Sequence, residues 1–122
     1  MTNALIALAG ATGALLRYRI GLAVGARSFP WATLGINVSG CFLIALVLGG
    51  PLASRWGTST TAAVTIGLLG SYTTFSTFGY ETFTLLRTDR VGAALAYVGA
   101  SLVGGLLAAA AGYGVARSMF SV

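Results

Sequence analysis

The sequence has no histidine and no lysine, a single cysteine, Cys41, and only two acidic residues, Glu81 and Asp89. A nucleophile with an adjacent base, or a pair of catalytic carboxylates, cannot be assembled from so few groups. One cysteine also excludes an intramolecular disulfide. Cys41 lies inside an apolar run, so we interpret it as a small hydrophobic residue. The sequence predicts that the protein is not an enzyme.

Charge is also scarce, because charged residues make up 7% of the 122 residues and hydrophobic residues make up 57%. Soluble domains have about 25% charged residues. The net charge of +5 comes from seven arginines, and so small an excess indicates side chains at lipid headgroups and no binding of nucleic acid. We expect a multi-pass protein of the cell inner or plasma membrane.

Four apolar segments are each about as long as a bilayer crossing requires. Both prolines, Pro30 and Pro51, lie in the connections between them. The sequence therefore predicts an all-α membrane protein with one domain, residues 1–122, whose four transmembrane helices span about 3–24, 32–48, 60–86 and 91–116. Both termini then share a side, and the arginines favour cytoplasmic first and third connections only weakly. Insertion in both orientations stays open.

Small residues recur every fourth position along the last helix and predict a face that meets another helix. They are Ala100, Gly104, Ala108, Gly112 and Ala116. Four helices of this length are too few to enclose a hydrated path. A transport function therefore requires an oligomer, most simply a two-fold dimer.

The segment from Gly70 to Gly79 lies in the middle of the third apolar span and is rich in glycine, serine and threonine. These residues favour helix poorly, and their hydroxyls compete for backbone hydrogen bonds. We therefore expect the third helix to break between Gly70 and Thr73. Irregular backbone at membrane depth must be buried in protein or line a cavity, and carbonyl groups freed there can bind a cation. The alternative is a continuous helix whose hydroxyls bond to the preceding turn.

Phe75 and Phe78 follow this break, three residues apart. The edge of an aromatic ring is positive, so such rings can stabilise a small anion without a formal charge. A weak interaction of this kind suits an ion path, because the ion must be able to leave as well as enter. Packing and lipid contact are the alternative roles of these rings.

Two polar pairs are spaced i, i+4 on helices: Thr33 with Asn37, and Tyr97 with Ser101. The amide of Asn37 could donate to an anion or form an interhelical hydrogen bond, and its spacing does not decide between the two. We expect Arg17 and Arg19 to extend to the membrane interface, although they could also attract anions to a pore mouth. Glu81 is a functional candidate because it is an ionisable residue at membrane depth, and the sequence identifies no partner for it.

Three stretches together resemble the Fluc, or CrcB, family of fluoride channels. They are Gly13-Ala14-Leu15-Leu16-Arg17-Tyr18, then Thr33-Leu34 with Asn37 and Gly40, then Gly70 with Thr73-Thr74-Phe75-Ser76-Thr77-Phe78. The resemblance implies an antiparallel, dual-topology dimer that exports fluoride passively through two pores. It also implies pore positions at Phe75, Phe78, Asn37, Tyr97, Ser101 and Thr33, and a structural sodium ion at the dimer centre held by the backbone carbonyls of Gly70 and Thr73.

The chain departs from the family pattern at Ala32, where glycine is frequent, and at Gly105, where a second serine is expected. Some relatives pair two different subunits, so a heterodimer stays open beside the homodimer. Another alternative is a proton-coupled efflux transporter like the small multidrug resistance proteins. Those proteins use a glutamate in the first helix, which this chain lacks. A last alternative is a non-conducting assembly subunit.

Overall fold

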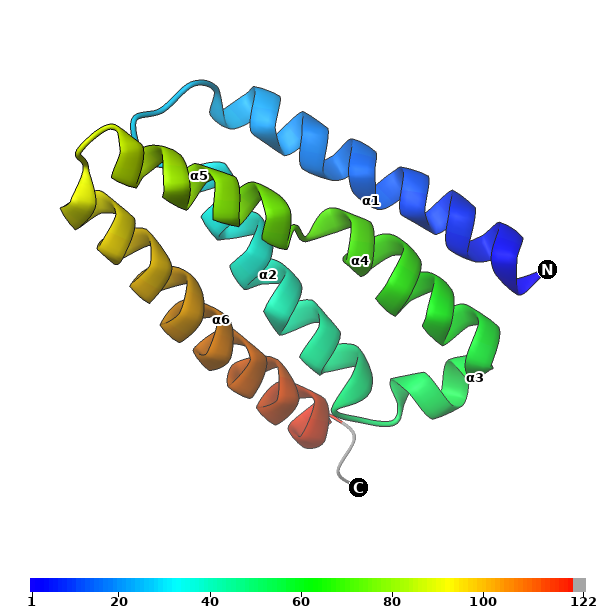
Figure 1. The fold of residues 1–122 in the computed structure, drawn as a ribbon. Coiled ribbons are helices and arrows are strands. Elements are labelled where there is room, and N and C mark those ends of the chain that lie inside the picture. Colours follow the sequence, from blue (N-terminus) through cyan, green and yellow to red (C-terminus); the bar gives the residue numbers. More distant parts are fainter. Residues whose placement is uncertain (120–122) are drawn as a thin grey trace.

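The protein is all-helical in the computed structural model, which describes residues 1–119, and no strand occurs in that range. Three of its helices are long and apolar enough to cross a membrane: α1 (Thr2–Val24), α2 (Trp31–Leu48) and α6 (Val91–Met119). Their bounds lie within three residues of those expected for the first, second and last spans. The start of α1 and the end of α6 lie at one end of the bundle (Figure 1).

The third expected span is a series of four segments, which run one after another through the bundle (Figure 1). They are α3 (Leu52–Ala62), the π-helix η1 (Ala63–Leu68), α4 (Leu69–Tyr72) and α5 (Phe75–Arg87). Helical structure therefore begins at Leu52, well before the expected start near residue 60. Gly57 interrupts α3 with a φ of 82°. Only glycine adopts this φ without steric cost, which explains the bend.

The break in the third span lies at Thr73 and Thr74, which have extended backbone with ψ angles of 159° and 123°. Both residues lie in the segment from Gly70 to Gly79, so the predicted break is confirmed, although Gly70, which was expected to begin it, is helical within α4. The hydroxyl of Thr74 accepts the N–H of Thr77 at 3.2 Å and so caps α5. A side chain that can cap the next helix decides where the break falls, whereas a single glycine is tolerated inside the helix.

The two halves of the broken span pack on different neighbours. η1 and α4 pack along α1, whereas α5 packs on α6 and α2, which form the most extensive pair of the bundle. Close approach of α1 depends on Gly13, where an added Cβ would meet the carbonyl oxygen of Leu68 and Oγ of Ser71. The break is thus the point at which the chain passes from one packing partner to the other.

The face of small residues on α6 packs against α2, as predicted. A Cβ at Gly104 would lie 3.3 Å from the side chain of Val38, and one at Gly112 would collide with the backbone of Phe42. Ala116 is buried, but Ala100 is exposed. The stripe therefore mediates helix contact only from Gly104 onward.

Candidate functional site

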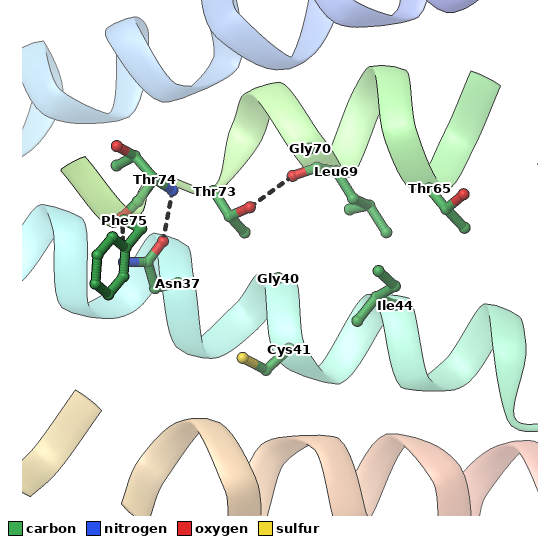
Figure 2. Close-up of a pocket in the computed structure, with 10 residues that line it drawn as sticks. All are labelled: Asn37, Gly40, Cys41, Ile44, Thr65, Leu69, Gly70, Thr73, Thr74 and Phe75. Carbon is green, nitrogen blue, oxygen red and sulfur yellow. Dashed lines mark hydrogen bonds between the residues drawn. The ribbon is translucent and has the colours of Figure 1, made fainter. Parts of the chain in front are cut away.

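Asn37 ties α2 to the break through both polar atoms of its amide (Figure 2). Its Oδ1 accepts the N–H of Thr74 at 2.8 Å, and its Nδ2 donates to the carbonyl of Thr74 at 2.9 Å. An asparagine amide carries two N–H donors, so one donor is left for another partner. The structure places Asn37 in the interhelical role, and donation of its second N–H to an anion stays a prediction.

Arg17 ties α1 to the other side of the break. Its Nε donates to the carbonyl of Ser71 at 3.1 Å, and the residue is half-buried. The expectation that Arg17 extends to the membrane interface was therefore wrong, whereas Arg19 is exposed. A guanidinium at this position satisfies a carbonyl near the end of a helix and interacts favourably with the negative end of its dipole.

Ser71 adds a second tie to α1. Its hydroxyl lies 2.7 Å from the carbonyl oxygen of Gly10 and 2.8 Å from that of Gly67. A backbone break within a membrane is stable only when its polar groups find partners in the protein. Arg17 and Asn37 provide such partners on the two sides of the break, and the Ser71 hydroxyl holds the preceding turn against α1.

Gly70 and Thr73, the predicted sodium ligands, line one groove of about 290 Å³ together with Asn37 and Gly40 (Figure 2). The N–H of Thr74 would bond the Gly70 carbonyl in a continuous helix, but here it bonds Asn37. Thr73 turns its hydroxyl back to the Leu69 carbonyl at 2.8 Å. A carbonyl without its helical partner is the kind of oxygen ligand that a hard cation takes. These residues fit a sodium ion, which stays a prediction.

The two phenylalanines after the break differ in burial. Phe75 is 83% exposed, whereas Phe78 is partly buried and packs on Tyr97, which is fully buried. The ring centroids of Phe78 and Tyr97 are 5.0 Å apart, and those of Phe78 and Phe75 are 5.9 Å apart. Phe78 thus links an aromatic cluster inside the subunit to a ring that projects from its surface.

The buried hydroxyl of Tyr97 donates to Oε1 of Glu81 at 3.1 Å. Sequence reasoning singled out both residues without pairing them, because they lie on different helices, 16 positions apart. One turn further along α6, the hydroxyl of Ser101 is buried and has no hydrogen-bond partner within residues 1–119. A buried hydroxyl without a partner is costly, and a small anion could accept its hydrogen bond.

Thr33 is 7% exposed and lies in a second cavity of about 460 Å³, which is also lined by Arg17, Thr74 and Thr77. The groove that contains Gly70 does not include Thr33, although Asn37 and Thr74 line it. Thr33 and Asn37 therefore do not share one cavity. Thr74 lines both, so the two hollows lie on either side of the break. Sequence reasoning did not single out Thr74 or Thr77 as individual lining residues.

Comparison with known proteins connects this chain to a family. The family model described as "CrcB-like protein, Camphor Resistance (CrcB)" matches residues 4–113. The chain belongs to the CrcB-like family. It is 45% identical over 113 residues to a "Fluoride-specific ion channel FluC" of Thermus thermophilus, covering 89% of this chain and 88% of that protein.

Two further relatives match over nearly their whole length. A "Fluoride-specific ion channel FluC 2" of Geobacillus kaustophilus is 44% identical over 116 residues, which are 92% of this chain and 90% of that protein. A "Fluoride-specific ion channel FluC" of Chloroflexus aurantiacus is 44% identical over 123 residues, with 96% and 97% covered. Because these matches cover most of both chains, the resemblance extends well beyond the threonine and phenylalanine motif.

The departure at Gly105 has a packing consequence. Gly105 is buried, and a Cβ there would lie 3.3 Å from Sγ of Cys41. A serine at this position would need the cysteine to move. The row of hydroxyl groups that starts at Tyr97 on this face of α6 therefore ends at Ser101 in this CrcB-like protein.

Proposed function

We propose that this chain forms a fluoride-selective channel that lets fluoride leave the cytoplasm passively. The observation that carries the proposal is near-full-length identity of about 45% to proteins named fluoride-specific ion channels. Such channels are not enzymes. A proton-coupled efflux transporter is not favoured, because these relatives are named as ion channels and α1 (Thr2–Val24) contains no acidic residue.

The chemistry of the site supports an anion path without fixed positive charge. Phe78 packs beside Tyr97, whose hydroxyl donates to Glu81, and the Ser101 hydroxyl one turn further along α6 still needs a partner. Uncharged donors hold an anion firmly enough for entry and weakly enough for exit. Fluoride is the smallest halide and accepts hydrogen bonds strongly, so a narrow row of such donors favours it over chloride.

The working unit in this proposal is an antiparallel dimer. Phe75 projects from the subunit with 83% of its surface exposed, and the hollows beside the break are open grooves of a single subunit. A second copy would cover Phe75 and close these grooves. The α1–α2 and α5–α6 connections lie at one end of the bundle, and Arg27, Arg90 and, in the last turn of α5, Arg87 belong to them. The start of α3 and the end of α6 lie at the other end, with Arg55 and Arg117. So weak a bias permits both orientations in the bilayer.

A sodium ion at the centre of this dimer would hold the two breaks together. Gly70 and Thr73 from each subunit would provide the carbonyl oxygens, and the ion would offset the cost of unpaired carbonyls away from water. Both residues lie in the open groove, where a second subunit can reach them.

The proposal is tested by fluoride efflux from liposomes that contain only this polypeptide, with chloride as the control ion. We expect passive fluoride efflux and no chloride efflux. A well-folded dimer that passes no fluoride would rule out the homodimeric channel. Co-expression with a second CrcB-like chain from the same source would then test the heterodimer, and failure there would leave only an assembly role.

A further inference from the structure

A third hollow, of about 270 Å³, lies where the α1–α2 connection meets the end of α5 and the start of α6. Arg27, Arg90, Thr84 and Glu81 are among its lining residues. Both loops lie at the end of the bundle that is opposite the N-terminus (Figure 1). We name this hollow the loop pocket. It opens at the level where the loops meet water and headgroups.

The loop pocket carries more positive than negative charge. Arg27 donates one N–H to the Val24 carbonyl at 3.0 Å, and Arg90 donates one to the Ser28 carbonyl. A guanidinium has five N–H donors, so each arginine keeps donors for another acceptor. Neither forms an ion pair within residues 1–119, and the one carboxylate in the lining, Glu81, is engaged by the Tyr97 hydroxyl.

Hydroxyl groups continue from the loop pocket into the subunit. Thr84 lies one turn after Glu81 on α5, and its hydroxyl is buried without a hydrogen-bond partner in the described part of the chain. Glu81 contacts Tyr97, and the next turn of α6 holds Ser101, whose hydroxyl is also unpartnered. These two hydroxyls, Thr84 and Ser101, are the buried side-chain polar atoms left unpaired within residues 1–119, and they flank the Tyr97 and Glu81 pair.

We propose that the loop pocket is the mouth of the anion path, where Arg27 and Arg90 collect a small inorganic anion and the Thr84 hydroxyl passes it toward Tyr97. This inference rests on the proposed fluoride channel and adds residues to its path. Exposed arginines raise the local anion concentration through long-range attraction, which salt screens. A buried, uncharged hydroxyl acts at contact distance, where salt screens it much less.

The test measures initial fluoride efflux from liposomes at about 0.01 M and about 0.5 M ionic strength, set with an impermeant salt. Arg27→Gln should lower the rate about threefold at low ionic strength and converge with the wild-type rate at high ionic strength. Thr84→Val, which removes the hydroxyl and keeps the shape, should lower the rate at both. Arg87→Gln is the matched control, because Arg87 is exposed at the same corner but does not line the loop pocket.

Equal rates for wild type, Arg27→Gln and Thr84→Val would overturn the inference. An equal loss in Arg27→Gln and Arg87→Gln would also overturn it, because general surface charge would then explain the effect. In both cases the wild-type protein still conducts, so the proposed function survives. A wild-type protein without fluoride efflux would instead remove the proposed function, and the inference with it. Elution as a dimer from a sizing column shows that each variant has folded.

Discussion

Asn37 holds Thr74 through both of its backbone polar groups, with an acceptor distance of 2.8 Å and a donor distance of 2.9 Å. The amide oxygen of Asn37 thus takes the place of the Gly70 carbonyl, which the Thr74 N–H would bond in a continuous helix. Its contact joins α2 to the point where the third span changes its packing partner. Asn37 therefore gives the Thr74 N–H a hydrogen-bond partner and also fixes the position of the break in the bundle.

Replacement of Asn37 by alanine should destabilise the protein. The N–H of Thr74 loses its hydrogen-bond partner in a site away from water, which costs about 1–3 kcal/mol, whereas the Thr74 carbonyl still accepts the first intrahelical bond of α5. Thermal unfolding in detergent, followed by the loss of the folded peak on a sizing column, measures the change. Thr12→Val is the control, because that hydroxyl is exposed and bonds only the Leu8 carbonyl of its own helix. Equal unfolding temperatures for the two variants would show that the contact contributes nothing.

Substitution of Phe75 and of Phe78 should distinguish an effect on fluoride conduction from an effect on folding. Phe75→Ile removes a ring that is 83% exposed and whose one ring contact within residues 1–119 is with Phe78, so the single subunit should fold as before. If the ring edge contacts the ion, fluoride efflux should fall about tenfold, which corresponds to about 1.4 kcal/mol at the barrier. Phe78→Ile should reduce efflux as well and also loosen the cluster around Tyr97.

Phe83→Ile is the control for this pair, because Phe83 lies on the same helix and is 59% exposed. Its substitution should leave efflux unchanged. If Phe75→Ile and Phe78→Ile conduct like Phe83→Ile, the rings serve only for packing.

Hydropathy was sufficient to predict the all-helical fold, because span length depends only on how many apolar residues follow one another. The position of the break was harder to predict. Glycine, serine and threonine content predicted a break somewhere from Gly70 to Gly79, and the structure has it at Thr73 and Thr74, where Asn37 and the Thr74 hydroxyl provide replacement hydrogen bonds. Asn37 comes from a helix that is distant in the sequence, and the bond of the Thr74 hydroxyl depends on the rotamer of that side chain. Local composition predicts neither of these contacts.

The same limit applies to Arg17 and Glu81. Each is an ionisable residue near or within a span, and sequence reasoning had no partner for either. Arg17 bonds Ser71, 54 residues away, and Glu81 bonds Tyr97 on another helix. Such pairs depend on how helices rotate against one another, which a single sequence does not encode in its periodicity. The π-helix from Ala63 to Leu68 likewise has no signature in composition.

Gly13→Ala should weaken the contact between α1 and the broken span. The new methyl group would collide with the Leu68 carbonyl oxygen and with Oγ of Ser71, and overpacking of this kind costs about 1–3 kcal/mol. The thermal midpoint in detergent should fall. Gly21→Ala on the same helix is the matched control, because nothing lies within 4 Å of a Cβ there. A fall that is equal in both variants would assign the effect to helix propensity and not to the contact.

Removal of sodium should destabilise the dimer. Gly70 and Thr73 lie in an open groove beside the break, and the Thr74 N–H that would normally bond the Gly70 carbonyl is taken by Asn37. An ion that binds only the assembled state stabilises it by mass action, by about 2.7 kcal/mol when its concentration is one hundred times its dissociation constant. Exchange of all sodium for a bulky organic cation should therefore lower the melting temperature of the dimer or stop fluoride efflux.

A test of cation identity distinguishes a sodium ion bound at the dimer centre from a general dependence on ionic strength. Restoring sodium at constant ionic strength should recover both the melting temperature and the efflux, because screening depends on ionic strength and not on the identity of the cation. A cation too large to fit between carbonyl oxygens should not recover either property. If sodium-free protein, verified by metal analysis, melts and conducts like the sodium form, no ion links the subunits. The Asn37 contact alone would then stabilise the extended backbone at Thr73 and Thr74, and the break would serve to line the grooves.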